Sequence, residues 1–191
     1  ANGILLWGVQ VEVGSFPTSY IPTSGSTVTR SVDTAKMTGS AFTDFYSANE
    51  ISVYGEFERG WSNSSISNFY PMIMAISSGG TNDVLSVYLN QGYAFYFEPR
   101  ANGATQAILG TPTASAGEPH KFAGCLKTND FAMSFDGSTA YTDNFGLTPM
   151  NVDQFWIGSR NGSFGFTGTI KKLAFYPQRL SNDTLQAMTE E

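Results

Sequence analysis

The sequence has few of the residue types that catalytic and metal-binding sites use most often. It contains one cysteine, Cys125, and one histidine, His120. A single cysteine cannot form a disulfide within the chain, and a single histidine leaves little from which to build a zinc site or a Ser/His/Asp triad. We therefore expect Cys125 to be a buried, inert thiol and His120 to be a surface residue at the start of a strand.

Charge, and positive charge above all, is scarce in this chain. Charged residues make up 14% of it, and the formal net charge is −6. Because nucleic-acid affinity depends mainly on cationic side chains that displace counterions from phosphates, this balance excludes a nucleic-acid partner. No apolar run reaches the length of about 18 residues that crosses a bilayer, so we expect no membrane insertion.

The chain is rich instead in aromatic residues and in residues that form turns. Aromatic side chains account for 14% of its 191 residues, and there are 20 glycines. From residue 51 onward, short apolar runs such as YAFYFEP and DQFWIGS alternate with turns such as NQG and SRNG. Such spacing is typical of two antiparallel sheets that each bury one face against the other. The sequence therefore predicts an all-β, two-sheet antiparallel jelly-roll sandwich.

One short helix is expected at the C-terminal end. In SNDTLQAMTEE, Ser181 stands in the place of an N-cap, and Leu185 and Met188 lie three residues apart. This spacing puts the two apolar side chains on one helix face. We predict a helix of one or two turns that docks on the sandwich through them.

The alternation of side chains along each strand predicts which of them face the core. Within 51–58, Ile51, Val53 and Phe57 should be buried, and within 93–100 the same should hold for Tyr93, Phe95 and Phe97. The run 72–76 is apolar at both parities, which indicates a central strand covered on both sides. The outward side chains of several strands are aromatic or polar, and we expect them to share one concave sheet face: Tyr54, Glu56, Glu58, Tyr88, Tyr96, Glu98, Arg100 and Trp156.

Residues 1–33 are expected to form a separate part of the chain. Apolar residues recur there with a period of two, which predicts a strand: Leu5, Trp7, Val9, Val11 and Val13. A strand this early suggests that the chain was cut from a longer polypeptide and that the strand closed an upstream β-module. Prolines in the following stretch favour an extended strap laid against the next domain. We therefore expect 1–33 to be the remnant or joint of an upstream module, and 34–191 to be the jelly-roll domain.

Two segments in the C-terminal part of the chain resemble one known family. The segment GFTGTIKKLAFYPQRLSNDTLQAM resembles the closing strand and helix of concanavalin A-like, laminin G-like jelly rolls, at Phe166, Gly168, Ile170, Leu173, Tyr176, Leu180 and Ser181. The preceding FWIGSRNG resembles the family's penultimate strand, at Ile157, Gly158 and Gly162. The resemblance implies a concanavalin A-like lectin/glucanase fold.

The opening stretch is similar to a joint in tailed-phage structural proteins. There, LWGxQxExG ends a β-sandwich and SYIPTxGxxVTR leads into a laminin G-like domain, and Leu6, Trp7, Gly8, Gln10, Glu12, Gly14, Tyr20, Ile21, Pro22, Thr23, Gly25, Val28, Thr29 and Arg30 match. The resemblance implies a tail protein located in the virion, or extracellular when released, with neighbouring modules of a longer virion protein as partners.

Sugar binding is the function that the outward side chains favour. Sugar rings stack their C–H faces on aromatic rings, while their hydroxyls bond to amide, carboxylate and guanidinium groups. Besides the sheet face, we expect contributions from loop residues, namely Trp61, Arg160, Asn161 and Phe164. The sequence thus predicts a non-catalytic carbohydrate-binding module for a polysaccharide or cell-surface glycan, with Trp156 as the main stacking platform and Trp61 as the next.

Two other functions stay open at this point. A glycoside hydrolase acting on β-glucans would use Glu56 and Glu58 as its paired carboxylates, although the E-x-D-x-x-E motif of laminarinase-like enzymes is missing. A purely architectural virion domain would need no ligand at all.

No cofactor is required by the predicted function. Calcium is a common companion of the fold and could be held by Asp83, Asp136 or Asp143. Because no Asp-rich loop of calcium-binding spacing occurs in the sequence, we expect no metal site.

Overall fold

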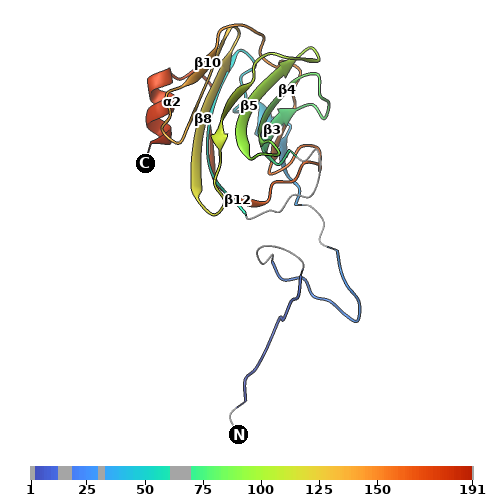
Figure 1. The fold of residues 1–191 in the computed structure, drawn as a ribbon. Helices are drawn as coiled ribbons and strands as arrows, with labels where there is room; N and C mark the ends of the chain where they lie inside the picture. The colour runs from blue at the N-terminus through green and yellow to red at the C-terminus, as the bar shows by residue number, and fades with distance from the viewer. Residues whose placement is uncertain (1–2, 13–18, 30–32, 61–69, 191) are drawn as a thin grey trace.

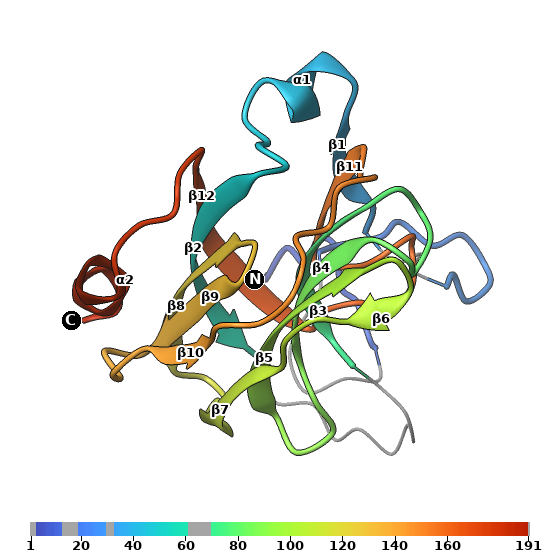
Figure 2. The same ribbon diagram turned by 90° about the horizontal axis from the view of Figure 1, so that it is seen from above.

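Two antiparallel sheets face each other, as Figures 1 and 2 show, and an aromatic core lies between them. The computed structural model describes residues 3–12, 19–29, 33–60 and 70–190. The architecture confirms the predicted all-β jelly-roll sandwich with a short C-terminal helix.

The first sheet has seven strands within the described residues. Its order is β1 (Ala35–Thr38), β11 (Gln154–Ile157), β3 (Met72–Ser77), β4 (Val84–Leu89), β5 (Ala94–Ala101) and β6 (Ala104–Thr105), and β7 (Leu109–Thr113) also pairs with β5. β3 lies inside this sheet and is buried along its whole length, which confirms the prediction of a central strand covered on both faces.

The second sheet has five strands within the same part of the chain. Its order is β10 (Tyr141–Asp143), β9 (Asp130–Phe135), β8 (Pro119–Lys127), β2 (Glu50–Arg59) and β12 (Gly168–Tyr176). β2 is paired along nine positions with β8 and on its other side with β12. The strand that carries Glu56 and Glu58 is therefore central in this second sheet.

Phenylalanine rings from both sheets fill the space between them. Phe57 of β2 and Phe95 of β5 stack with their ring centres 6.0 Å apart. Ile51 and Val53, predicted to face inward, are buried in the same cluster. Each fully buried aromatic or aliphatic side chain of this size contributes about 1.5–3 kcal/mol to stability, so this interior holds the two sheets together.

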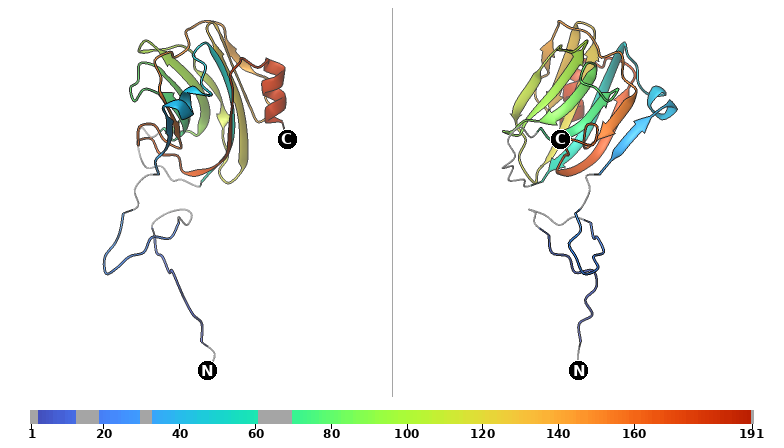
Figure 3. Two further views of the ribbon diagram at one scale, coloured as in Figure 1. Left: turned by 180° about the vertical axis from the view of Figure 1, so that it is seen from behind. Right: turned by 90° about the vertical axis from the view of Figure 1, so that its right-hand side faces the viewer.

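Helix α2 (Asn182–Thr189) covers the outer face of the five-stranded sheet, as Figure 3 shows. Ser181 caps it by accepting a hydrogen bond from the backbone N–H of Thr184 at 3.2 Å, and Leu185 is fully buried against the sheet. Both points confirm the sequence-based prediction. Cys125 lies buried beneath the helix, where burial raises the pKa of its thiol to about 11, as expected of an inert cysteine.

A second helix was not predicted. The single turn α1 (Ser40–Thr43) buries Phe42, whose ring stacks on Tyr46 with centres 4.9 Å apart. Four residues are too few to show a helical period in the sequence, so only the buried aromatic ring marks this turn. No helix in the described part of the chain is long and apolar enough to cross a membrane.

The N-terminal segment lies apart from the sandwich in Figure 1. The predicted strand is absent from residues 3–12, and its apolar side chains are exposed; that of Trp7 is 87% exposed. A strand needs a neighbour to complete its hydrogen bonds, and residues 3–12 pair with no strand in the described part of the chain. They do contact the following segment, where Gln10 accepts a bond from the N–H of Ile21 at 2.8 Å. Residues 19–29 are largely exposed, so they are not laid against the sandwich. The division at residue 33 stays a prediction.

Candidate functional site

A cavity of about 600 Å³ opens on the outer face of the seven-stranded sheet. It is lined by Tyr70, Met72, Thr81, Ser86, Tyr88, Glu98, Arg100, Arg160 and Phe164. β4 and β5 form its floor, and the loop after β11 supplies Arg160 and Phe164. A mixed lining of this kind, with aromatic rings beside a few convergent polar groups, is typical of ligand sites.

Strand register brings the floor residues together. Ser86 of β4 lies directly opposite Glu98 of β5, and Tyr88 lies opposite Tyr96. Because opposite residues of an antiparallel pair point to the same side of the sheet, all four side chains face outward. The inward residues between them, Phe95 and Phe97, are fully buried, so the predicted faces of this strand pair are confirmed.

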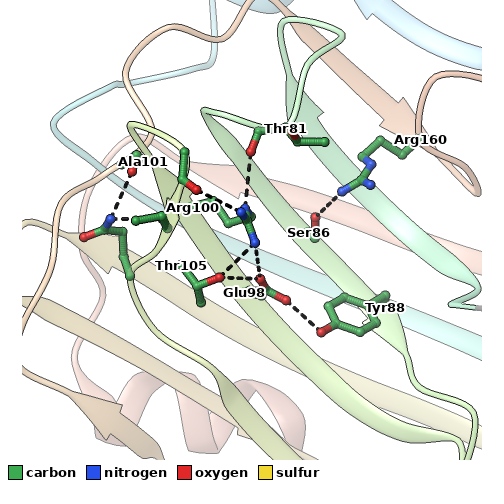
Figure 4. A network of polar contacts seen from close by, with 11 residues as sticks. Thr81, Ser86, Tyr88, Glu98, Arg100, Ala101, Thr105 and Arg160 are labelled. Atoms are coloured by element: carbon green, nitrogen blue, oxygen red, sulfur yellow. Dashed lines mark hydrogen bonds and ion pairs between the residues drawn. The ribbon is translucent and has the colours of Figure 1, made fainter.

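Glu98 stands at the centre of the polar network drawn in Figure 4. Its Oε2 accepts a hydrogen bond from the hydroxyl of Tyr88 at 2.7 Å, and its Oε1 accepts one from Thr105 at 3.0 Å. The guanidinium of Arg100 lies 3.5 Å from the same Oε1. Both carboxylate oxygens therefore have partners within the protein.

Arg100 is tied to three backbone or side-chain oxygens besides Glu98. Its Nε donates to the carbonyl of Thr81 at 3.2 Å, Nη1 to the hydroxyl of Thr105 at 3.0 Å, and Nη2 to the carbonyl of Gly103 at 3.0 Å. These bonds join the start of β4 to the hairpin between β5 and β6, as Figure 4 shows. Arg100 thus forms a fixed wall of the cavity.

Arg160 makes fewer and weaker contacts within the protein than Arg100 does. Its Nη1 donates a long hydrogen bond to the hydroxyl of Ser86 at 3.4 Å, and its guanidinium lies 5.0 Å from the centre of the Phe164 ring. Burial lowers the pKa of Arg160, although the negative charge of Glu98 works against this shift. Arginine nevertheless keeps its proton in proteins. Arg160 therefore brings a charge with unused donors into the cavity.

Two tyrosines, Tyr70 and Tyr88, line the aromatic side of the cavity, and Tyr96, predicted to bind the ligand, stacks on Tyr88 without lining it. Tyr88 and Tyr96 are stacked with ring centres 5.4 Å apart, and Tyr70 meets Tyr88 edge-on at 5.8 Å. Burial, and then the hydrogen bond to Glu98, raises the pKa of Tyr88 far above its usual value, so its hydroxyl stays a donor. Tyr70, which is 38% exposed, presents its ring at the rim.

Trp156 does not form the exposed platform that we expected. Its parity was predicted correctly, because it points away from the inter-sheet core, but it is only 7% exposed. It packs in a small cluster with Met72, Ala75 and Val84. β1 runs beside β11 and places the ammonium of Lys36 over the indole at 5.0 Å. The cluster also contacts Tyr88 and Phe164, so the indole packs beside the cavity and supports two of its lining residues.

Tyr54, Glu56 and Glu58 are not part of the same face, which corrects the predicted composition of the site. β2 belongs to the five-stranded sheet, so its outward side chains lie on the opposite side of the sandwich from the cavity. Tyr54 is buried under α2 and donates its hydroxyl to Glu56 at 2.6 Å.

Glu56 and Glu58 both have lysine partners from the neighbouring strand β12. The ammonium of Lys171 lies 3.0 Å from Glu58, and that of Lys172 lies 4.0 Å from Glu56. Paired in this way and remote from the cavity, they are surface ion pairs. The geometry gives no support to their use as catalytic carboxylates.

The remaining predicted loop residues have other places. Asn161 has a positive φ of 53° and donates its amide to the carbonyl of Gly79, so it fixes the loop that carries Arg160 without lining the cavity. Trp61 lies outside the described residues. Phe164, as expected, contributes a ring to the cavity wall.

His120 is buried, which corrects the prediction of a surface residue. It is 6% exposed, and its Nδ1 lies 2.7 Å from the carboxylate of Asp136. Its Nε2 lies 3.0 Å from the carbonyl oxygen of Ser115. The two partners explain how a polar ring is accommodated at this depth.

The candidate calcium ligands are dispersed. Asp83 accepts bonds from the backbone of Met150 at 3.3 Å and the amide of Asn151 at 3.5 Å, and Asp143 accepts one from the backbone of Phe145 at 3.0 Å. Asp136 bonds to His120. In the described segments, no three acidic, histidine or cysteine side chains gather into a group that could hold a metal ion.

Four lining residues were missed by sequence reasoning. Ser86 shares the parity of Tyr88 two positions later in VLSVYLN, so its outward position could have been read from the pattern. Met72 lies in a strand that is apolar at both parities, which hides its outward direction. Tyr70 and Thr81 lie in loops, where no periodic signal exists.

Solved structures of distant sequence share this sandwich. The CBM40 module of the Ruminococcus gnavus IT-sialidase, solved with α2,6-sialyllactose bound, aligns with a TM-score of 0.60 and 18% identity over 74% of this chain and 84% of that one. The NanB sialidase of Streptococcus pneumoniae gives a TM-score of 0.64 and 13% identity, over 82% of this chain but 26% of the enzyme. A heptameric SAP-like pentraxin of Limulus polyphemus gives 0.55 and 11%, over 74% and 70%.

Sequence comparisons add nothing to these structural likenesses. No protein-family model matches the chain, and no curated protein matches it. Because one fold can host many functions, identities of 11–18% carry the fold alone. The chain is similar in structure to CBM40 modules and pentraxins, and it is a jelly-roll sandwich of the concanavalin A-like kind.

Proposed function

We propose that this chain is a non-catalytic carbohydrate-binding module, and that the cavity over β4 and β5 binds its glycan. The observation that carries the proposal is the lining: the rings of Tyr70, Tyr88 and Phe164 stand beside guanidinium and hydroxyl groups in a space of about 600 Å³. Aromatic rings can stack on the C–H faces of a sugar while donors and acceptors bind its hydroxyls.

The charges in the cavity favour a sugar that carries a carboxylate. The cavity holds two guanidiniums and one carboxylate. Glu98 and Arg100 are paired with each other, whereas Arg160 makes no ion pair among the described residues. An arginine with free donors in a partly buried site suits a carboxylate, which it can bind through two parallel hydrogen bonds. The sialyllactose bound by the Ruminococcus gnavus module, an acidic sugar, supports this choice of ligand class.

A glycan screen with the full chain tests both statements. The array should contain neutral polysaccharides and oligosaccharides with uronic or sialic acids. We expect retention on the acidic set, and Arg160→Gln should weaken it about tenfold or more, since hydrogen bonds to charged groups contribute about 1.5–3 kcal/mol. Lys171→Gln, on the five-stranded sheet, is the matched control and should bind as wild type does. Melting temperatures verify folding.

Two results of this screen would count against the proposal. If the wild type binds no glycan, the alternative of a purely architectural domain is favoured. If Arg160→Gln binds as well as wild type, the cavity is not the binding site. Hydrolysis of β-glucans that disappears in Glu56→Gln would instead support the glycoside hydrolase alternative, which no contact in the structure favours.

The wider context in our proposal is a phage or prophage structural protein, located in the virion or extracellular when released. It rests on the likeness of residues 6–30 to the joint of tailed-phage proteins. Neighbouring modules of a longer virion protein would then be its partners. Peptides of this chain in purified virions, found by mass spectrometry, would support this context, and their absence from virions of a producing phage would contradict it.

A further inference from the structure

The polar side chains of the cavity differ in how far their hydrogen-bonding capacity is used by partners within the protein. Both oxygens of Glu98 accept hydrogen bonds from the protein, and its side chain is only 15% exposed. Arg160, in contrast, uses one long bond to Ser86. A ligand entering the cavity therefore meets free donors on Arg160 and an acceptor on Glu98 that is already engaged.

The partners of Glu98 come from three strands. Tyr88 lies on β4, Thr105 on β6, and Arg100 two residues along β5 itself. Arg100 in turn reaches the carbonyl of Thr81, before β4. Glu98 is thus the common acceptor through which one tyrosine hydroxyl and one guanidinium are fixed relative to each other.

We propose that Glu98 is a positioning residue of this cavity: it holds Tyr88 and Arg100 in the geometry that receives the glycan and does not itself bind the ligand. The inference rests on the proposed glycan-binding function. Loss of the carboxylate leaves the hydroxyls of Tyr88 and Thr105 without their acceptor and the Arg100 guanidinium without its ion pair, although Arg100 keeps the carbonyls of Thr81 and Gly103 as acceptors. The wall of the cavity is then held less firmly, while no direct ligand contact is lost.

An NMR measurement tests the positioning role without any glycan. The Nε–H of Arg100 donates to the Thr81 carbonyl, and a hydrogen-bonded Nε–H exchanges slowly enough with water to give a resolved ¹H–¹⁵N signal. The signal is assigned by its absence in Arg100→Lys. We expect it to be broadened in Glu98→Ala, broadened less in Glu98→Gln, and unchanged in Glu58→Gln. An unchanged signal in folded Glu98→Ala would overturn the proposal.

A double-mutant cycle then measures the effect on the ligand. With the best glycan of the screen, Glu98→Ala should weaken binding about tenfold, and Glu98→Gln, which keeps the shape and one acceptor, about two- to threefold. In an Arg100→Ala background, the Glu98→Ala change should cause a smaller loss than in wild type, because only Tyr88 is then left for Glu98 to position.

The two proposals fail in different ways. A wild type that binds no glycan overturns the proposed function, and with it this inference. A wild type that binds, combined with Glu98→Ala and Arg100→Ala losses that multiply, overturns only the positioning role and shows that Glu98 contacts the sugar directly. If Glu98→Ala melts too early to be measured, Glu98→Gln carries the same test, since equal losses in both backgrounds would count against the proposal.

Discussion

The outer faces of the two sheets carry a similar pattern of tyrosine and glutamate side chains, but they form different surfaces. β2 presents Tyr54 and Glu56 outward, and β4 with β5 presents Tyr88 and Glu98. In both pairs the tyrosine hydroxyl donates to the glutamate, at 2.6 Å and 2.7 Å. Yet Tyr54 lies under helix α2, whereas Tyr88 lines a cavity.

The difference lies in what covers each face. A helix of eight residues with one fully buried leucine closes the outer face of the five-stranded sheet. Among the described residues no helix covers the outer face of the seven-stranded sheet, and the loop after β11 places Arg160 and Phe164 at the border of the cavity. A polar, aromatic strand face is thus compatible with either a docking surface or a binding site, and the segment laid over it decides which one it becomes.

The largest expected effect comes from loosening the covered face. Leu185→Ala removes the fully buried contact of α2 and should lower the free energy of unfolding by about 2–5 kcal/mol, as buried leucines do. Denaturant unfolding measures it. Met150→Ala, at a largely exposed side chain, is the control and should change stability by about 0.5 kcal/mol or less. Glycan binding by folded Leu185→Ala should match that of wild type; a parallel loss would mean that the two faces are coupled.

The next effect comes from crowding the open face. Gly110 of β7 lies opposite Tyr96 of β5, and a Cβ added at Gly110 would lie 2.6 Å from the tyrosine ring. Gly110→Ala should displace that ring, disturb its stack on Tyr88, cost about 1–3 kcal/mol of stability and weaken glycan binding. Unfolding and binding assays are run beside Gly80→Ala, whose added Cβ meets nothing within 4 Å. Binding unchanged in Gly110→Ala would show that the tyrosine stack is not used.

A smaller effect depends on pH and should be confined to the five-stranded sheet, whose strand β8 carries His120. Burial pushes the pKa of His120 down, but its hydrogen bonds to Asp136 and the Ser115 carbonyl outweigh this and raise it above the usual value. Stability from this pair is therefore complete below the unfolded pKa of about 6.5 and is lost as pH rises through the folded pKa.

The measurement compares wild type with Asp136→Asn between pH 5 and 9. Asp136→Asn should be less stable at the acid end by about 1 kcal/mol, and the difference should shrink as pH rises. Glycan binding should not follow this titration. A stability difference that stays constant over the whole range would contradict a charged His120.

The smallest effect is expected from a partly exposed glutamate of the five-stranded sheet, Glu58. Glu58→Gln removes a surface ion pair with Lys171 and should change stability by about 0.5 kcal/mol or less, with no change in glycan affinity. Differential scanning calorimetry and the same glycan assay check this. A clear loss of glycan binding in Glu58→Gln would show that β2 shares the ligand surface after all.

The part of the fold that could be predicted from sequence was the part governed by local period. Alternation placed Phe95 and Phe97 inside and Glu98 and Arg100 outside, and the N-cap pattern at Ser181 located the helix. These features depend only on residues close together in the sequence, so the sequence alone is enough to predict them.

The parts that were missed depend on partners far away in sequence. The assignment of β2 and β5 to different sheets follows from pairing with β8 and β4, which alternation does not encode. Trp156 points in the predicted direction, but β1, more than a hundred residues earlier, runs alongside it and carries Lys36 over its ring. The position of a residue in the alternating pattern predicts the direction of its side chain. The exposure of that side chain depends on which other segments pack against it.

The bonds of Arg100 and Tyr88 to Glu98 also bear on the entropy of binding. Because these side chains are ordered in the free protein, their loss of rotational freedom is a cost of folding and not of complex formation. A ligand then meets a preorganised wall, with Arg160 the main group left to settle. Calorimetry should accordingly find a small entropic penalty for glycan capture, and the penalty should grow when Glu98 is replaced.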